Sequence, residues 1–156
     1  MPTTHADHPE VDLARFAALV PADHGLAVIA LALPDHSTHA SVANAGVLPH
    51  PLTERPVVGV VARGVARKLQ HLRANPRATI VLRAGWQWAA VEGPVELVGP
   101  DDPRPGIAPD RLRLLLREIF TAAGGEHDDW DAYDRAMAAQ RRTALLLSPE
   151  RLYANP

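Results

Sequence analysis

The sequence predicts a mainly β fold of the α+β class, in which an antiparallel sheet closes into a small barrel with peripheral helices. Two pairs of strand-like segments adjoin each other across short turns, which is the pattern of β-hairpins. Helical periodicity is confined to short segments around these hairpins, which favours an antiparallel sheet over a parallel, doubly wound one. The chain length fits one domain, residues 1–156, in which we expect residues 1–9 to be flexible.

Five elements are expected in the first half of the chain. Apolar residues at near-helical spacing predict a short helix before Pro21. Branched and apolar residues on both sides of a Pro-Asp-His-Ser turn predict a strand pair, and the segment PVVGVVA predicts a third strand. After Gly64, an apolar stripe predicts a short helix that ends before Pro76. The stripe consists of Val65, Leu69 and Leu72, and the five elements cover residues 10–19, 26–33, 38–48, 56–62 and 64–75.

The second half predicts a hairpin, two helices and a final strand. The hairpin strands cover residues 77–83 and 86–98, with a bulge or bend expected at Gly93–Pro94. A broad apolar face predicts a helix over 111–123, which ends at a Gly-Gly pair. Aspartates at the start and arginines at the end of 128–142 favour a further helix, because these charges complement the helix dipole. The segment TALLLS, residues 143–148, predicts the last strand.

Charge is distributed unevenly along the chain. Residues 55–91 contain no acid and seven cations, including Lys68, the only lysine, so a +7 segment is set against a −9 remainder. Local basicity of this size points to an anionic partner. The absence of cysteine excludes disulfides, thiolate metal sites and cysteine nucleophiles. A polar N-terminus and the lack of a long apolar run lead us to expect a cytoplasmic protein without a signal peptide or membrane span.

Three cations surround the start of the helix expected after Gly64. Arg63, Arg67 and Lys68 lie beside N–H groups that we expect to be free near residues 64–66, and this combination suits a phosphate. Cations in a first turn oppose the helix dipole by about 0.3–1 kcal/mol each, which a bound anion would reverse. The alternative is a solvated helix face. Nucleic acid is disfavoured, because no nucleic-acid module is recognisable and the rest of the chain is acidic.

Other residues could border a planar ligand. Trp86 and Trp88 share one face of a strand, where they could form an aromatic wall or pack in a core or dimer interface. His39 and Ser41 share one face of the second strand and Asn44 lies on the other, with ordinary strand packing as the alternative.

Metal and hydrolase chemistry have little support in the sequence. His36 with His39, or His5 with His8, could approach one metal ion, but no HExxH or carboxylate set accompanies them, so surface histidines are favoured. The GxSxG, P-loop and GxGxxG motifs are also missing.

Several strings resemble the split β-barrel flavin and deazaflavin oxidoreductases of the pyridoxamine-phosphate-oxidase-like superfamily. They are HASVANAGVL, VARGVARKLQHLRANPRATIVL, GWQWAAVEGPVELVGPDD and GEHDDWDAYDRAM, and they are similar to the branch that uses the deazaflavin coenzyme F420. The resemblance covers nearly the full chain and implies a homodimer with each cofactor site where two barrels meet. It implies that Lys68 reaches the cofactor phosphate with Arg63 and Arg67 as partners. It also implies that His39, Ser41 and Asn44 border the ring system and that Trp86 lies near the ring edge.

The resemblance implies an oxidoreductase that passes a hydride from reduced coenzyme F420 to an unsaturated or carbonyl-type small molecule. The third strand lacks the arginine-to-lysine pattern typical of FMN-binding members, which favours coenzyme F420 over FMN as the cofactor. The sequence assigns no catalytic residue or proton donor. Two other functions stay open: a flavin, deazaflavin or tetrapyrrole binding protein without turnover, and an FMN-dependent oxidase or reductase.

Overall fold

The computed structural model describes residues 11–156, so the expectations for residues 1–9, including the His5 and His8 pair, lie outside the described residues. The elements in chain order are α1 (Ala14–Leu19), the 3₁₀ helix η1 (Val20–Asp23), β1 (Leu26–Ala32), β2 (Thr38–Pro49), β3 (Pro56–Ala62), α2 (Arg67–Ala74), β4 (Arg77–Ala84), β5 (Gln87–Val98), α3 (Pro109–Ala122), α4 (Trp130–Ala139), β6 (Thr143–Leu147) and β7 (Arg151–Ala154). Among residues 11–156, no helix has the length and apolar character needed to cross a membrane.

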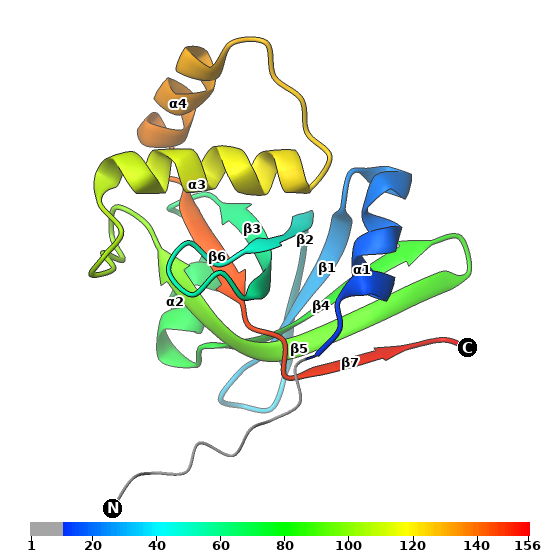
Figure 1. The fold of residues 1–156 in the computed structure, drawn as a ribbon. Coiled ribbons are helices and arrows are strands. Elements are labelled where there is room, and N and C mark those ends of the chain that lie inside the picture. The colour runs from blue at the N-terminus through cyan, green and yellow to red at the C-terminus, as the bar shows by residue number, and fades with distance from the viewer. Residues whose placement is uncertain (1–10) are drawn as a thin grey trace, which may run out of the picture.

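Antiparallel strands close into a barrel, as the sequence predicts. The strand order is β4-β1-β2-β3-β6-β5, and β5 pairs with β4 to complete the circle. Figure 1 shows α3 and α4 together on one side of this barrel, with α2 near one of its ends. The predicted antiparallel barrel with peripheral helices is therefore confirmed.

Strand β5 has no bulge at Gly93–Pro94, one of the two features predicted there. Its pairing with β4 continues without a bulge up to Pro94, and only its other partner changes, from β7 over residues 89–92 to β6 over residues 95–98. A Cβ on Gly93 would lie 2.0 Å from the carbonyl oxygen of Ser148. The glycine therefore allows the connection between β6 and β7 to pass close to the backbone of β5, rather than marking a bulge.

One strand was not predicted, and two helices have bounds that differ from the predicted ones. Strand β7 was not predicted, because four residues carry too short a pattern and the strand is defined by its pairing with β5. Helix α2 begins at Arg67, so Val65 precedes it and is 86% exposed, while Leu69 and Leu72 of the predicted stripe are buried. Helix α4 ends at Ala139, which leaves Arg142 in the segment that leads into β6.

The core has two parts on opposite faces of the barrel wall. Side chains from all six strands β1 to β6 fill the barrel interior, and Phe16 of α1 closes it together with Leu13, the residue before α1. The second part lies between the outer face of β3 and β6 and the helices α3 and α4. All residues of β6 are buried, because one face of this strand meets the barrel interior and the other meets α3.

Helix α3 packs close to the barrel wall through a pair of facing glycines. Gly46 on β2 lies opposite Gly59 on β3. A Cβ on Gly46 would lie 2.5 Å from the backbone of Ala122, and one on Gly59 would lie 2.9 Å from Ile119. The two glycines therefore let the C-terminal part of α3 approach the sheet, and this approach places α3 and α4 beside the outer face of β2.

Candidate functional site

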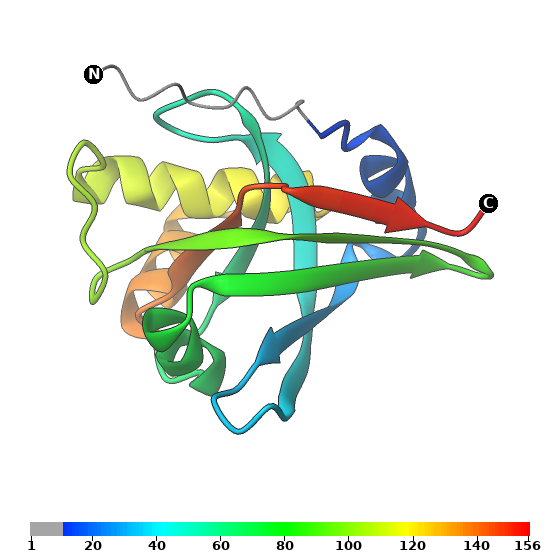
Figure 2. The ribbon, with the colours of Figure 1, turned by 90° about the horizontal axis from the view of Figure 1, so that it is seen from below.

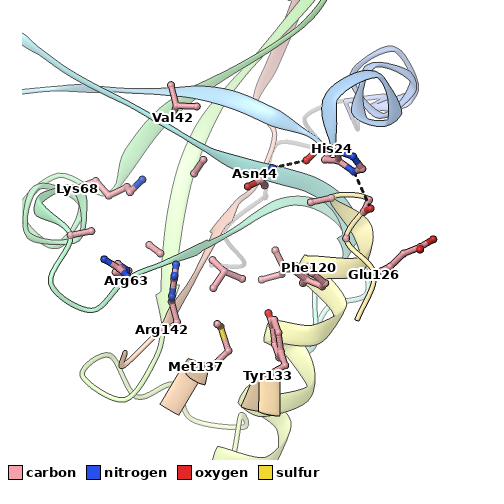
Figure 3. A pocket seen from close by; sticks show the side chains of 18 residues that line it. His24, Val42, Asn44, Arg63, Lys68, Phe120, Glu126, Tyr133, Met137 and Arg142 are labelled. Carbon is pink, nitrogen blue, oxygen red and sulfur yellow. Dashed lines mark hydrogen bonds between the residues drawn. The ribbon is translucent and has the colours of Figure 1, made fainter. Parts of the chain in front are cut away.

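An open pocket of about 890 Å³ lies between the barrel wall and the helices α3 and α4 (Figure 3). This volume is in the range of small-molecule and cofactor sites. The pocket is bordered by β2, the end of β3, the start of α2, the residue before β6 and the C-terminal part of α3 with the following loop. Its lining therefore comes from segments that are far apart in the sequence.

One side of the pocket is cationic. Arg63 follows β3, Lys68 lies in the first turn of α2 and Arg142 precedes β6, and all three line the pocket. Lys68 is only 8% exposed, and its Nζ donates to Ser41 Oγ at 3.1 Å. Figure 3 shows these three side chains on the same side of the pocket. Within residues 11–156, no carboxylate forms a salt bridge with any of the three.

The three cations raise one another's energy. Burial lowers the pKa of Lys68, and repulsion from Arg142 lowers it further. Burial also lowers the pKa of Arg142, with repulsion from Arg63 as the next cause. A buried charge without a counter-charge is unfavourable, and an anion bound among these side chains would remove this repulsion. The electrostatics of this side of the pocket therefore suit an anionic group.

The backbone at the start of α2 contributes less than the sequence predicts. Two of the N–H groups expected to be free are already used: Gly64 N donates to Gln140 O at 3.1 Å, and Ala66 N donates to Arg63 O at 3.0 Å. Arg67 is exposed and does not line the pocket. The cationic side of the pocket is therefore built from converging side chains of separate elements, and two of the three N–H groups expected to be free at residues 64–66 are not free.

The opposite side of the pocket is more apolar. Phe120 from α3 and Tyr133 and Met137 from α4 lie there. The rings of Phe120 and Tyr133 form a cluster with those of His127 and Trp130. Tyr133 Oη donates to Leu116 O at 3.0 Å, and burial raises the pKa of Tyr133 to about 12. Tyr133 is therefore a neutral, fixed wall of the pocket at physiological pH.

The residues predicted from the second strand separate onto two faces. Asn44 lines the pocket together with Val42 on the outer face of β2. Ser41 points to the other face, where it contacts Lys68. His39 does not line the pocket, and its ring packs 5.1 Å from that of His71 on α2.

Trp86 does not line this pocket within the same chain. It precedes β5 at the tip of the β4–β5 hairpin and is 93% exposed. Figure 2 shows this hairpin tip beside the C-terminus, whereas α2 is at the other end of the barrel. The structure therefore brings Arg63, Lys68 and Asn44 together in one pocket, with Ser41 behind Lys68, and places Arg67, His39 and Trp86 outside its lining.

Arg142, His24 and Tyr133 line the pocket and were not predicted as site residues. The sequence analysis placed Arg142 at a helix end, where it would complement the dipole. A cation directly before the strand TALLL, which is apolar except for Thr143, was the available signal. No local pattern identifies His24 or Tyr133, because each reaches the pocket only through the packing of the helices and turns against the barrel.

Metal ligation has no geometric basis in the described part of the chain. No group of three or more histidine, aspartate or glutamate side chains in residues 11–156 is arranged to hold a metal ion. Among these residues, the His36 and His39 pair has no third ligand of these types beside it.

No protein-family model matches the sequence. Three solved structures with this fold are informative. A pyridoxamine 5′-phosphate oxidase-related, FMN-binding protein from Nostoc punctiforme is 17% identical over 91% of this chain and 78% of its own, with a TM-score of 0.61. A heme-binding protein from Mycobacterium smegmatis is 16% identical over 94% of this chain and 55% of its own, with a TM-score of 0.62. An F420 reductase is 15% identical over 83% of this chain and 90% of its own, with a TM-score of 0.55.

These likenesses show the fold, a split β-barrel of the kind found in pyridoxamine-phosphate-oxidase-related proteins. The chain spans about half the length of the heme-binding protein. Proteins that share this barrel thus carry different cofactors, so the cofactor of this chain has to be argued from its own pocket.

Proposed function

We propose that the pocket binds a phosphate-bearing flavin-type cofactor, with coenzyme F420 as the first candidate, and that the protein is an oxidoreductase. The observation that carries the proposal is the convergence of Arg63, Lys68 and Arg142 without a carboxylate partner among residues 11–156. Three clustered cations repel one another in the ligand-free protein, and an anionic ligand would turn this repulsion into attraction.

The shape of the pocket favours a cofactor over a free inorganic anion. The cationic side leads to an apolar side formed by Phe120, Tyr133 and Met137, and the whole pocket measures about 890 Å³. An anionic end and a flat aromatic ring, joined in one molecule, match these two sides. The F420 reductase and the FMN-binding protein of similar fold support this class of cofactor.

The protein's own part in the reaction would be binding and placement. When bound, the cofactor would supply the hydride chemistry. Lys68 and Arg142 would hold its phosphate, with Arg63 at the exposed rim, and Ser41 would keep the Lys68 amine in position through their hydrogen bond. Phe120 and Tyr133 would cover a ring and exclude water from one side of it.

Two alternatives make different predictions. An FMN-dependent oxidase or reductase would use the same phosphate contacts, and the protein would then be purified as a yellow FMN complex. A tetrapyrrole carrier is supported by the heme-binding protein of similar fold, because propionate groups would also suit the three cations. A carrier would bind its ligand stoichiometrically without oxidising reduced coenzyme F420 in the presence of quinones or enones.

Titration of purified protein with coenzyme F420, FMN and heme tests the proposal. Lys68→Met should weaken cofactor binding by roughly 10- to 100-fold, because it removes a contact to a charged group worth about 1.5–3 kcal/mol. Arg67→Met is the matched control, since it removes an adjacent cation that is exposed and outside the pocket, and it should bind FMN like the wild type. Equal affinity of Lys68→Met and wild type for every ligand would contradict the phosphate assignment.

We also propose that the protein is a homodimer, with a small molecule as substrate. Leu26, Val28 and Val42 lie on the outer face of the β1–β2 pair, and each exposes 43% or more of its surface. Val42 also lines the pocket, so a second copy on this face would border the cofactor, and its Trp86 could then reach the site as the resemblance implies. Val28→Lys should shift the mass measured by sedimentation from dimer to monomer. A wild-type monomer would contradict this proposal.

A further inference from the structure

We infer that His24 is the catalytic residue that exchanges a proton with the substrate, through its Nε2 atom. The inference rests on the proposed function, because it assigns the proton that must accompany hydride transfer. Of the described residues, His24 combines a fixed ring, a free ring nitrogen and a place in the pocket lining on the side away from the cations.

Three separate elements hold His24 in place. Its backbone is in the left-handed region, with φ of 50°, at the end of η1. Asn44 on β2 donates from Nδ2 to the His24 carbonyl at 2.8 Å. The ring contacts the loop after α3, where Nδ1 lies 3.2 Å from Gly124 O. A positive φ is uncommon for a residue other than glycine, and such residues cluster at functional sites when the surrounding structure fixes them.

The contact with Gly124 determines which ring nitrogen carries the proton. A carbonyl oxygen can only accept a hydrogen bond, so His24 Nδ1 must be the donor and must carry hydrogen. In the neutral ring, Nε2 is then unprotonated and its lone pair is free. The ring is exposed, so water can deliver a proton to Nε2 or remove one from it.

The position of His24 fits a ligand that is anchored at the other side of the pocket. Figure 3 shows Lys68, Arg63 and Arg142 on one side and His24 with Glu126 on the other. A cofactor whose phosphate lies among the three cations would extend its ring along the pocket toward His24. A substrate stacked on that ring would then have Nε2 of His24 near its reacting bond.

Reduction of the substrate requires one hydride and one proton. One carbon of an electron-poor C=C or C=O bond receives a hydride, which oxidises the reduced cofactor, and the other atom of that bond receives a proton. The proton comes from Nε2 of the protonated His24, which is thereby left neutral with hydrogen on Nδ1 alone. Water then restores the proton on Nε2. The substrate gains one hydride and one proton and is reduced by two electrons.

Other candidate donors in the pocket are less suitable. Tyr133 already donates its hydroxyl hydrogen to Leu116 O, and burial raises the pKa of Tyr133 to about 12, so it is a poor proton donor. Ser41 faces Lys68 on the opposite face of β2. Glu126 lies on the same side as His24 and is the residue that must be distinguished from it by experiment, so Glu126→Gln serves as the matched variant.

The first experiment needs no turnover. Long-range ¹H–¹⁵N NMR of the ligand-free protein should show His24 with hydrogen on Nδ1 and an unprotonated Nε2 at alkaline pH, and saturating coenzyme F420 should shift these resonances. Hydrogen on Nε2 alone would overturn the inference, as would resonances that do not move while the cofactor binds. A wild-type protein that binds neither coenzyme F420 nor FMN would instead overturn the proposed function.

The second experiment uses His24→Gly. Glycine adopts the left-handed backbone without strain, which offsets the loss of the ring contact, so the variant should fold and bind cofactor like the wild type. Oxidation of reduced coenzyme F420 by menadione and by cyclohex-2-enone should fall about 10²- to 10⁴-fold in kcat, and added imidazole should restore part of it. Glu126→Gln should lower kcat far less than His24→Gly, and added imidazole should not change its kcat. Wild-type turnover in His24→Gly, or no turnover of either acceptor by the wild type, would overturn the assignment.

Discussion

Replacing Lys68 by methionine should stabilise the ligand-free protein. Lys68 is 8% exposed and beside Arg142, and its one hydrogen bond to a described residue is the contact with Ser41. Methionine keeps most of the apolar stem, removes the buried charge and leaves the half-buried Ser41 hydroxyl able to bond to water. The substitution therefore removes an unfavourable interaction of the ligand-free fold and leaves no buried polar group unpaired.

The size of the effect follows from two opposing contributions. The lost hydrogen bond contributes about 0.5–1.5 kcal/mol, whereas an unpaired buried polar group costs about 1–3 kcal/mol and a charged one costs more. We expect the free energy of unfolding to rise by about 1–2 kcal/mol from this difference. In a domain of this length, such a change raises Tm by roughly 2–8 °C.

Thermal unfolding in chloride and in phosphate at matched ionic strength measures this prediction. Phosphate should raise the Tm of the wild type, because a ligand that binds only the folded state stabilises it. It should leave the Tm of Lys68→Met nearly unchanged. Arg67→Met, which removes a neighbouring exposed cation, should alter stability by about 0.5 kcal/mol at most and keep the response to phosphate. A lower Tm for Lys68→Met in chloride, or an undiminished phosphate response, would refute the reasoning.

Three further predictions follow from the same structure. Folding lowers the pKa of Lys68 below its ordinary value of 10.5, so the unfolded chain binds more protons between the lowered value and 10.5. Wild-type stability should therefore rise with pH in that window relative to Lys68→Met, as urea titrations at several pH values would show. Gly46→Ala should cost about 1–3 kcal/mol and weaken cofactor binding, because its Cβ would lie 2.5 Å from the backbone of Ala122 and displace α3; denaturant unfolding and cofactor titration measure both. Asp134→Asn should lower Tm at neutral pH, because a hydrogen bond from Arg117 lowers the pKa of Asp134 below 3.8, and this stabilisation is present above pH 3.8. The difference in Tm from wild type should shrink as the pH falls through the lowered pKa.

The barrel could be predicted because its strands carry strong local patterns. The strands β1 to β4 and β6 lie within about one residue of their predicted bounds, since branched apolar runs and turn residues define both ends. Strand β7 could not be predicted, because its four residues form a strand only by pairing with β5. The start of α2 was also misplaced, because Gly64 lies in the turn after β3 and packs against Arg141 instead of opening the helix.

The site was predictable only where its residues lie within the acid-free segment. Arg63 and Lys68 were found because they are close together in the sequence and unusually basic. Arg142 and His24 come from distant segments, and only the closure of the barrel brings them to the same pocket. Trp86 also belongs to the acid-free segment, but it lies at an exposed hairpin tip and does not line the pocket of its own chain.

Ion pairing distinguishes the cations on α3 from the non-exposed cations in the pocket. Five lysine or arginine side chains among the described residues are not exposed: Lys68, Arg111, Arg113, Arg117 and Arg142. The three on α3 are partly exposed, and each pairs with a carboxylate on α3 or α4. The two in the pocket have no such partner in residues 11–156, although Arg141, next to Arg142, pairs with Asp101. The high arginine content of the chain does not explain why Lys68 and Arg142 lack a carboxylate partner among the described residues, because water solvates a buried cation less well than an exposed one. An anion bound as proposed would supply the counter-charge that Lys68 and Arg142 lack among these residues.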